Sequence, residues 1–450
     1  MTAMNRVMAA LALAGLTGCA SVGGSGGSAD RCPGGVQPGR WVKMADQPGA
    51  GLDSVGPPGR AGQRILTLTS YWPPAGFIYD ACADRWRPMS TAGAPKETGA
   101  RYWNGRELIA VPAGAAAFAY DLERDAWSPR GAIPRGWTAP PEQYRLETPY
   151  VLFVRGPMAK GDFGPGGFVW DTRTGTAAPI GGDALSMRAT TSSAWVGERF
   201  ATWGGVVEPH QPGPWLSVGD GGVLERKGDA WAWRKMTARG APSPRAPETA
   251  AASGSRLVVW GGWTVVANKQ ECFTDGAAYD VEADSWRPIP SAGAPSPRQH
   301  SISVGTDRHF VVMGGDAACD AQRKSLPDGG VFDLEAGTWK SFTLPGWVAR
   351  EYADVTALDD GRVLILPRVS NGLVGTWMAV LDPATAQVTR VELPRELQNR
   401  TGTQAVVMGR RLFLFGGNRP LPRPDCHGIT PCDAAGPTSE ATPGGMVYGL

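Results

Sequence analysis

The chain has 450 residues, of which 42% are apolar, and it contains 62 glycines, 39 prolines and 18 tryptophans. This composition provides for a large core and is not that of a disordered chain, and long helical periodicity is absent beyond the N-terminal segment. The 44 basic and 42 acidic residues leave a net charge of +2, which argues against a nucleic-acid partner because such partners usually require a strongly basic surface.

The first 18 residues read as a signal peptide. Arg6 precedes an apolar run over residues 7–16, which is too short to span a membrane. The sequence Leu16-Thr17-Gly18-Cys19 resembles the bacterial lipobox, and this resemblance implies cleavage before Cys19 and lipidation of its thiol. Ala20 stands where an Asp is associated with retention at the inner membrane, so we expect an outer-membrane lipoprotein of a bacterial cell envelope. The alternative is a soluble secreted protein in which Cys19 is incidental.

A tether and a single large domain are expected to follow. Residues 19–39 include the Gly/Ser-rich run 21–28, which is typical of a flexible linker. Residues 40–44 have the character of an outer β-strand. We expect residues 40–450 to form one closed domain, because repeat architectures do not follow the usual relation between length and domain number.

The repeat unit is clearest between residues 245 and 290. Small apolar residues at 249–253 lead through a turn into a β-branched strand at 256–260, which stops at Gly261-Gly262. A loop leads to Tyr279-Asp280, and Trp286 follows after a tight connection. This order predicts four short strands, the first two joined as a hairpin.

The unit recurs along the chain. An aromatic or large apolar residue is followed seven positions later by Trp or its substitute, and the copies are 41 to 55 residues apart. These pairs are Tyr79→Trp86, Tyr120→Trp127, Trp170→Ala177, Leu224→Trp231, Tyr279→Trp286, Phe332→Trp339 and Leu381→Val388. Such a fixed offset indicates one supersecondary unit copied around or along an axis.

The predicted second strands are residues 65–69, 107–111, 150–154, 199–203, 256–260, 309–313, 363–366 and 412–415. Four of them end in a diglycine, at residues 204–205, 261–262, 314–315 and 416–417. Together with the Tyr-Asp and the downstream Trp, this pattern resembles the kelch motif. The resemblance implies an all-β fold, a kelch-type β-propeller of four-stranded blades like the central domain of galactose oxidase.

Eight second strands predict eight blades, with seven as the alternative because the first unit lacks a convincing first strand. The eighth unit has its third strand at residues 445–448, where a fourth is missing. We expect residues 40–44 to supply it, closing the ring and removing an open sheet edge.

Six cysteines remain after Cys19, an even number that suits disulfides in an oxidising compartment. Cys272 and Cys319 each follow a diglycine in corresponding loops of adjacent units, and Cys32 and Cys82 are neighbours in a closed ring. Cys426 and Cys432 would staple one long loop. We therefore expect the bridges Cys32–Cys82, Cys272–Cys319 and Cys426–Cys432.

Five arginines form the strongest candidate site. Each lies 11 to 13 residues before the core of its second strand: Arg188, Arg245, Arg298, Arg350 and Arg400. This offset puts them at the entrance to the innermost strands, where guanidinium groups could bind a carboxylate or phosphate, with His300 nearby. The alternative is that they make structural hydrogen bonds between blades.

Other chemistries find less support. Asp425, Cys426, His427 and Cys432 share one loop but match no standard zinc spacing, so we expect no metal. The copper radical chemistry of galactose oxidase needs two His and two Tyr ligands, which the four histidines here do not assemble. Sialidase, quinoprotein and Ser-His-Asp patterns are also incomplete, and no cofactor is expected.

The expected function is therefore a binding or scaffolding module held at the outer membrane by its lipid anchor alone, as a monomer. Protein, peptide or glycan ligands would dock on long loops that share one face, at residues 206–218, 265–275 and 418–443. Trp215, Trp263 and Phe273 are candidate contact residues, with partial burial as the alternative. A second hypothesis is a carbohydrate-active enzyme, such as a sugar epimerase or mutarotase, with its site at the channel mouth; whether the protein is an enzyme stays open.

Overall fold

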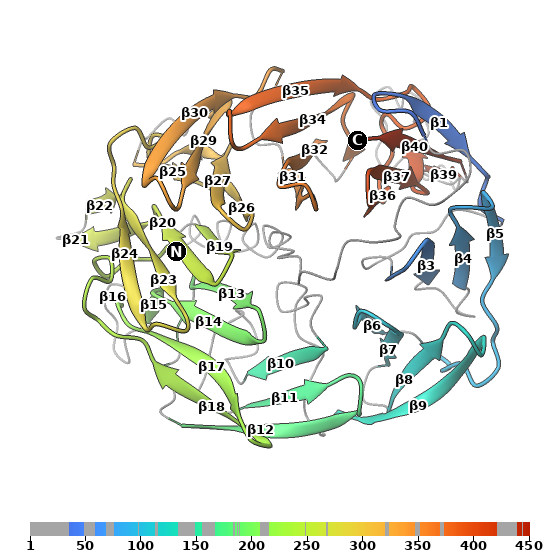
Figure 1. Ribbon diagram of the computed structural model, residues 1–450, viewed down its shortest axis with the longest axis horizontal. Helices are drawn as coiled ribbons and strands as arrows, with labels where there is room; N and C mark the ends of the chain where they lie inside the picture. Colours follow the sequence, from blue (N-terminus) through green and yellow to red (C-terminus); the bar gives the residue numbers. More distant parts are fainter. Residues whose placement is uncertain are drawn as a thin grey trace, which may run out of the picture.

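The computed structural model describes residues 36–48, 59–68, 76–97, 99–112, 116–133, 149–154, 167–182, 185–186, 188, 190–207, 216–247, 249–266, 269–319, 324–346, 352–369, 373–420, 439–442 and 444–450. Every named element in these ranges is a β-strand. No helix within them is long and apolar enough to cross a bilayer. The strands are arranged as a ring around a common centre (Figure 1), which confirms the all-β propeller.

The ring is built from small antiparallel sheets. The first group is β2 (Gly59–Ala61), β3 (Arg64–Leu68), β4 (Gly76–Asp80) and β5 (Arg85–Pro88), and the second is β6 (Ala100–Trp103), β7 (Leu108–Val111), β8 (Ala116–Asp121) and β9 (Ala126–Ala132). The third has β10 (Tyr150–Val154), β11 (Gly167–Asp171) and β12 (Thr176–Gly182) within the described residues. The fourth is β13 (Ser192–Val196), β14 (Arg199–Trp203), β17 (Gly221–Lys227) and β18 (Ala230–Lys235). β12 also pairs in parallel with β18.

Four more groups follow. The fifth is β19 (Thr249–Ser253), β20 (Arg256–Trp260), β23 (Gly276–Asp280) and β24 (Ser285–Ile289), and the sixth is β26 (Ile302–Gly305), β27 (His309–Met313), β29 (Asp328–Asp333) and β30 (Thr338–Thr343). The seventh is β31 (Tyr352–Ala357), β32 (Val363–Val369), β34 (Trp377–Asp382) and β35 (Gln387–Glu392), with β33 (Leu373–Val374) beside β32. The last is β36 (Gln404–Met408), β37 (Arg411–Phe415), β40 (Gly445–Gly449) and β1 (Trp41–Met44). We interpret these eight groups as eight blades and number them in this order.

The N-terminal strand completes the last blade. β1 pairs with β40 in antiparallel register, from Trp41 opposite Tyr448 to Met44 opposite Gly445. The expected closure by the N-terminal strand is therefore confirmed. β2 supplies the first strand of the first blade, which the sequence did not reveal. The predicted second strands coincide with β3, β7, β10, β14, β20, β27, β32 and β37.

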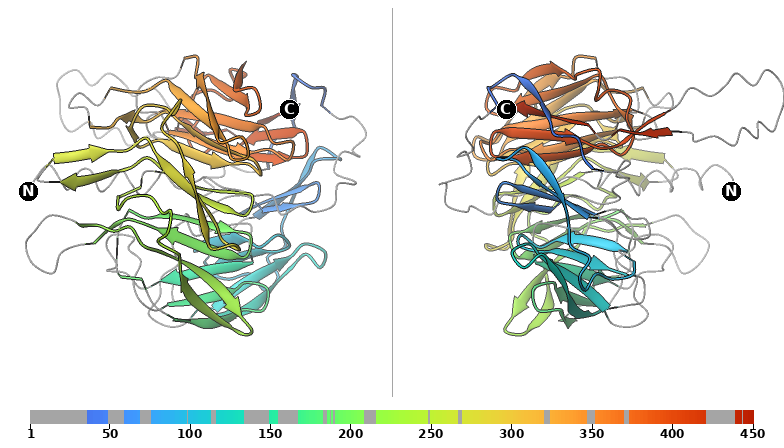
Figure 2. Two further views of the ribbon diagram at one scale, coloured as in Figure 1. Left: turned by 60° about the vertical axis from the view of Figure 1, so that its left-hand side comes forward. Right: turned by 90° about the vertical axis from the view of Figure 1, so that its right-hand side faces the viewer.

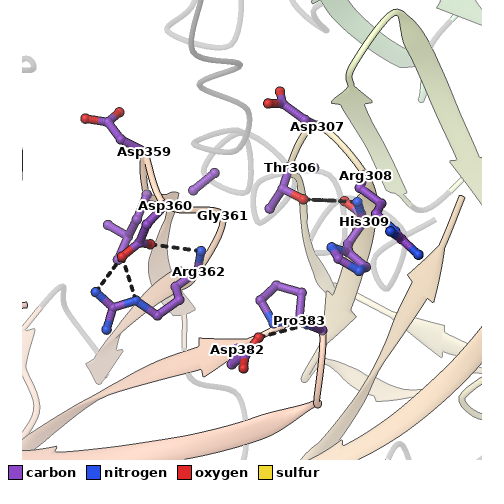
Figure 3. A pocket seen from close by; sticks show the side chains of 14 residues that line it. Thr306, Asp307, Arg308, His309, Asp359, Asp360, Gly361, Arg362, Asp382 and Pro383 are labelled. Carbon is purple, nitrogen blue, oxygen red and sulfur yellow. Dashed lines mark hydrogen bonds and ion pairs between the residues drawn. The ribbon is translucent and has the colours of Figure 1, made fainter. Parts of the chain in front are cut away.

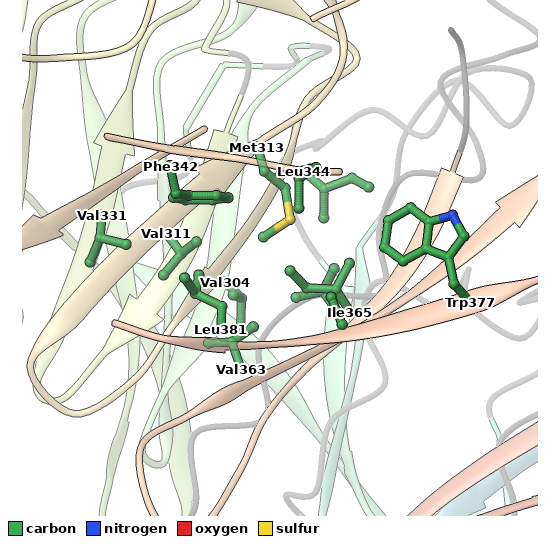
Figure 4. Packing of buried hydrophobic residues seen from close by; sticks show 13 residues of the cluster. Val304, Val311, Met313, Val331, Phe342, Leu344, Val363, Ile365, Trp377 and Leu381 are labelled. Carbon is green, nitrogen blue, oxygen red and sulfur yellow. The ribbon is translucent and has the colours of Figure 1, made fainter. Parts of the chain in front are cut away.

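The core lies between the blades and runs around the whole ring. Eight clusters of buried apolar residues each combine side chains from two neighbouring blades, including one between the eighth and the first. Figure 4 shows the cluster where Met313 and Phe342 of the sixth blade face Ile365 and Trp377 of the seventh. Because every blade buries both of its faces, inner strands such as β7 and β37 are buried at consecutive positions and do not alternate between buried and exposed side chains.

The recurring Tyr and Trp residues join each blade to the one before it. Trp286 Nε1 donates to the carbonyl of Thr237 in the fourth blade at 2.8 Å, and the amide of Thr237 donates to Asp284 Oδ1 at 3.0 Å. Tyr279 also donates to Asp284, whose left-handed backbone (φ 47°) turns its carboxylate toward both donors. One Asp–Trp pair thus binds both polar groups of a single peptide in the preceding blade.

The same clamp recurs at other positions. Trp127 and Asp125 bind Ser90, while Trp86 and Asp84 bind Ala45, which follows β1. The last of these spans the junction where the ring closes.

Candidate functional site on the loop face

Two faces of the ring differ in what they carry. We call the face where second strands end and third strands begin the loop face, and the opposite face, with the tight turns, the turn face. Four of the five predicted arginines lie at the loop face, directly before the innermost strands. Arg188, Arg245, Arg298 and Arg400 are all buried, whereas Arg350 lies outside the described residues.

Each buried guanidinium is bonded within its own blade. Arg245 Nη1 lies 3.4 Å from the carbonyl of Gly261 at the end of the second strand and 2.8 Å from Asp275 Oδ1 at the start of the third. Its Nη2 donates to Ser243 Oγ at 2.7 Å. The ring of Phe273 covers the guanidinium, with Cζ 3.8 Å from the ring centroid.

Arg188 and Arg298 repeat this arrangement, whereas Arg400 donates to two glycine carbonyls and its Nε has no hydrogen-bond partner. Arg188 bonds Gly204 and Asp220, Arg298 bonds Gly314 and Asp328, and Arg400 bonds Gly416 and Gly444. The hydrogen bond from Arg188 lowers the pKa of Asp220 despite partial burial of that carboxylate, and burial lowers the pKa of Arg298. These bonds occupy many of the donors of the four arginines with the backbone and side chains of their own blades, and this arrangement fits the structural alternative; anion binding by the arginine ring stays a prediction. The bonds run within a blade rather than between blades.

The diglycines allow this packing. Gly262 has φ of 96°, and a Cβ on it would come within 2.3 Å of the carbonyl of Ala246. Sequence reasoning missed the partner acids Asp220, Asp275 and Asp328. Their signal is an Asp-Gly pair that opens the third strand, which reads by itself as an ordinary turn.

Extra hairpins rise from the second-to-third connections. They are β15 (Val206–Val207) with β16 (Leu216–Ser217), β21 (Trp263–Val266) with β22 (Lys269–Cys272), and β38 (Asn418–Pro420) with β39 (Ser439–Ala441). In the sixth blade, β25 (Arg298–Gln299) pairs with β28 (Asp316–Ala317). The right-hand view of Figure 2 shows β21/β22 (yellow-green) and β38/β39 (red) projecting to the same side.

Two cross-links connect the extensions of neighbouring blades. Thr264 Oγ1 on β21 donates to Ser217 Oγ on β16 at 2.9 Å. On the other side, Cys272 at the end of β22 is disulfide-bonded to Cys319 of the sixth blade, the pairing expected from the sequence. We call β15, β16, β21, β22 and residues 316–319 together the hairpin ridge.

The ridge combines a fixed base with an exposed apolar top. Trp263 packs against Val206 and Ala246, and Phe273 covers Arg245, so both candidate contact residues are partly buried supports. Leu216 is 56% exposed and Val266 50% exposed, and Val265 is exposed beside them. Trp215 lies outside the described residues.

His300 lies beside the ridge, directly after Gln299, which pairs with Asp316. Its Nδ1 is 3.4 Å from Asp316 Oδ2, and Asp316 directly follows the diglycine of the sixth blade. Among the predicted binding residues that the structure describes, His300 is the one that pairs with an acid not bonded to one of the arginines. The sequence pattern did not identify this acid, Asp316.

A shallow cleft lies on the turn face, between the sixth and seventh blades. It is lined by the turns around Asp307, Asp360 and Asp382 (Figure 3). Arg362 lies 2.7 Å from Asp360 Oδ2, and Arg308 contacts Asp333 at 2.7 Å. These ion pairs join neighbouring positions within the turns of a blade, and burial lowers the pKa of His309. The cleft therefore reads as a junction between blades.

Several expectations lie outside the described residues: the lipidation site Cys19, the bridge Cys426–Cys432 and the loop with His427. Cys82 is disulfide-bonded, but its predicted partner Cys32 is also outside that range. Within the part of the chain that the structure describes, no group of three or more His, Cys, Asp or Glu side chains could hold a metal ion.

The fold and the repeated Gly-Gly, Tyr-Asp and Trp contacts define a kelch-repeat β-propeller. Residues 190–417 match the family model of the KLHDC2/KLHL20/DRC7 Kelch-repeats domain. The chain therefore belongs to the kelch-repeat family. Membership of this family indicates an interaction or scaffolding module.

Three proteins illustrate the similarity. Adagio-like protein 1 of Oryza sativa subsp. japonica is 31% identical over 206 residues, which cover 42% of this chain and 31% of that protein. Adagio-like protein 3 of the same plant is 30% identical over 221 residues, covering 46% of this chain and 33% of that protein. The dynein alpha chain of the flagellar outer arm of Chlamydomonas reinhardtii is 29% identical over 137 residues, covering 30% of this chain and 3% of that protein. The aligned regions span about a third of the length of the Adagio-like relatives.

Proposed function

We propose that this propeller is a protein-binding module, held at the bacterial outer membrane by a lipid on Cys19, whose partner docks on the hairpin ridge. The observation that carries the proposal is the apolar top of the ridge. Leu216, Val265 and Val266 are three of the four large apolar side chains exposed among the described residues. Exposed apolar groups gathered on one rigid projection are typical of an interaction site.

Rigidity supports docking at the ridge. A partner that binds a loose hairpin must order it at an entropic cost, whereas a cross-linked one has already lost that freedom. The Cys272–Cys319 disulfide and the Thr264–Ser217 hydrogen bond restrict the β21/β22 hairpin from both sides. We infer that binding here is governed by surface complementarity with little reorganisation.

The path of the N-terminus supports the anchor. β1 enters the last blade from the turn face, where Gly39 N donates to the carbonyl of Gly449, and runs toward the loop face. A lipid attached before residue 36 would therefore be connected to the propeller at its turn face, opposite the ridge. This orientation suits a module that presents its loops to a partner.

The alternative of a sugar epimerase or mutarotase relied on arginines and acids at the channel mouth. Four of those five guanidiniums donate to their own blades. A glycan is the alternative ligand. Binding to a glycan array, measured alongside the search for a protein partner, distinguishes the two.

The test is a comparison of three forms of the full chain in envelope preparations, by chemical cross-linking and mass spectrometry. The double variant Leu216→Asp, Val266→Asp should lose its cross-linked partner, since each buried apolar contact contributes about 1.5–3 kcal/mol. Val42→Asp is the matched control, because Val42 is also about half exposed (48%) but lies on β1.

Retention of the same partner by the double variant would contradict docking at the ridge. Fractionation of cells that carry Cys19→Ser tests the anchor separately, because that variant should leave the membrane fraction while its ridge still binds.

A further inference from the structure

The repeat itself identifies an unusual pair of side chains. In each blade with a diglycine, the second residue after the arginine lies near the first residue after the diglycine. The pairs at these positions are Thr190 and Val206, Pro247 and Trp263, His300 and Asp316, and Gly402 and Asn418. Within this set, the sixth blade alone has two ionisable side chains.

The backbone conformation of the repeat does not require a His and an Asp at these two positions. His300 has φ of 54°, but Thr190 with 56° and Gly402 with 69° adopt the same left-handed conformation at this position. β25 pairs Gln299 with Asp316, and bridges at the matching positions pair Ala246 with Trp263 and Thr401 with Asn418. The geometry belongs to the repeat, whereas the acid and the imidazole are particular to this blade.

Asp316 is buried without full hydrogen bonding. The residue is 7% exposed, its Oδ2 lies 3.4 Å from His300 Nδ1, and its Oδ1 has no hydrogen-bond partner. Burying a carboxylate oxygen without a hydrogen-bond donor costs free energy. Asp316 Oδ1 therefore needs a donor that the blade itself does not supply.

A second unsatisfied group lies one residue beyond His300, where the backbone of Ser301 passes close to Gly315, the residue before Asp316. Ser301 follows His300 and is 6% exposed, and its Oγ also has no hydrogen-bond partner. It immediately precedes β26, which is the innermost strand of the blade and contacts the innermost strands of both neighbouring blades. Ser301 thus lies at the loop-face start of the innermost strand, and Asp316 lies in the neighbouring second-to-third connection.

The loop that carries Asp316 is fixed. The amide of Ala318 donates to the carbonyl of Pro297 at 3.0 Å, and that of Ala317 to Lys324 at 2.7 Å. Cys319, three residues after Asp316, is bridged to Cys272 at the end of β22. The acid therefore cannot easily turn outward to water, and its position is set before any ligand arrives.

We propose that Asp316, Ser301 and His300 form a subsite for a protonated amine, such as a lysine side chain or a free amino terminus of the docked partner. A cation with several N–H donors satisfies the carboxylate and the hydroxyl together, and an anion would be repelled by Asp316. A metal ion is disfavoured, since no third ligand accompanies the pair within the described residues. The proposal depends on the proposed function only in that the ligand approaches the loop face.

The experiment uses small probes and the full chain without any partner, so that it is independent of docking at the ridge. The four histidines are labelled with carbon-13 at Cε1, and the His300 resonance is assigned with His300→Gln. Addition of n-butylammonium should shift that resonance saturably, whereas tetramethylammonium, which has the same charge but no N–H donor, should not.

Asp316→Asn should weaken n-butylammonium binding at least about tenfold, through loss of a charged hydrogen bond. The variant should fold, because Asn418 occupies the equivalent position in the last blade. Ser301→Ala provides a second variant that keeps the charge and should weaken binding about two- to tenfold. The control Asp307→Asn removes an exposed acid on the turn face of the same blade and should bind as the native chain does.

The inference is overturned if n-butylammonium leaves the His300 resonance unchanged, if tetramethylammonium shifts it equally, or if Asp316→Asn binds as well as Asp307→Asn. A stoichiometric response to Zn²⁺ with none to the amine would also overturn it. Loss of partner binding in the ridge variants with amine binding intact would concern the docking proposal separately.

Discussion

Single arginines hold the loop face together. Arg245 links a serine before the first strand, a glycine carbonyl after the second and an aspartate before the third. A planar guanidinium with five donors can make these bonds at once, which a lysine could not do. Arginine is well suited to bind a carboxylate ligand. In this protein the arginines donate instead to backbone carbonyls at the crowded ends of the inner strands.

Arg245→Ala should therefore destabilise the fold and not merely a ligand complex. Removal leaves the carbonyls of Ser243 and Gly261 and the carboxylate of Asp275 without this donor, and we expect the free energy of unfolding to fall by about 2–4 kcal/mol. Urea denaturation followed by tryptophan fluorescence measures it. Arg239→Ala is the control, because Arg239 is exposed and its loss should change stability by less than about 0.5 kcal/mol. Equal midpoints for the two variants would contradict a structural role.

At the scale of elements, the turn between third and fourth strands explains the spacing of the repeat. Asp284 and Trp286 bind the amide and the carbonyl of Thr237. In the next blade, Trp339 donates to the carbonyl of Pro290. Proline has no amide hydrogen to donate, and Gly337 replaces the aspartate at the matching position. In these two corners, the Trp binds a carbonyl in both, and an Asp accompanies it in the one where the preceding blade also offers an amide.

This corner predicts sensitivity to alkaline pH. Burial, together with the hydrogen bond to Asp284, raises the pKa of Tyr279 from 10.0 to about 12, even though Arg234 opposes the shift. A tyrosine whose pKa is higher in the folded state stabilises the fold fully below pH 10, and that contribution is lost as the pH rises through 12. Absorbance at 295 nm, taken as the difference between the native chain and Tyr279→Phe, should titrate near pH 12. A difference that titrates near pH 10 would be inconsistent with the buried corner.

At the scale of the whole molecule, stability depends on closure. Met44 of β1 packs with Ile65 and Tyr79 of the first blade and with Phe413 of the last. Trp86 reaches across the same junction to the carbonyl of Ala45. One short strand therefore completes a sheet, fills a core and joins the two ends of the chain.

Removal of residues 1–47 should open the ring. Loss of Met44 alone, a fully buried side chain, costs about 2–5 kcal/mol, and the bare edge of β40 is a template for aggregation. Removal of residues 1–35 is the matched control, because it also deletes Cys32 but keeps β1. We expect a lower melting temperature and high-molecular-weight species in size-exclusion chromatography for the longer deletion alone. If the two truncated chains have the same melting temperature, β1 is not the closing strand.

Much of this architecture could be predicted from the sequence, because its signals are local. A run of consecutive apolar residues such as 257–260, followed by Gly261-Gly262, indicates by itself both a buried strand and the place where the strand ends. The partner of Trp286 could not be predicted, since it is a backbone carbonyl in another blade that any residue can supply. The role of Arg245 was ambiguous for a similar reason. Its spacing indicates where it enters the blade, but Asp275, which decides its bonding, lies thirty residues away in an ordinary turn sequence.

Because Cys272 and Cys319 are joined by a disulfide, the rigidity of the ridge depends on the redox conditions under which the protein folds. In an oxidising surrounding the two sulfurs couple adjacent blades, whereas a glutathione-rich cytosol keeps such thiols reduced. Protein produced under reducing conditions would have the same ring of blades but would lack the Cys272–Cys319 bond. If a partner docks on the hairpin ridge as proposed, such protein should bind that partner more weakly.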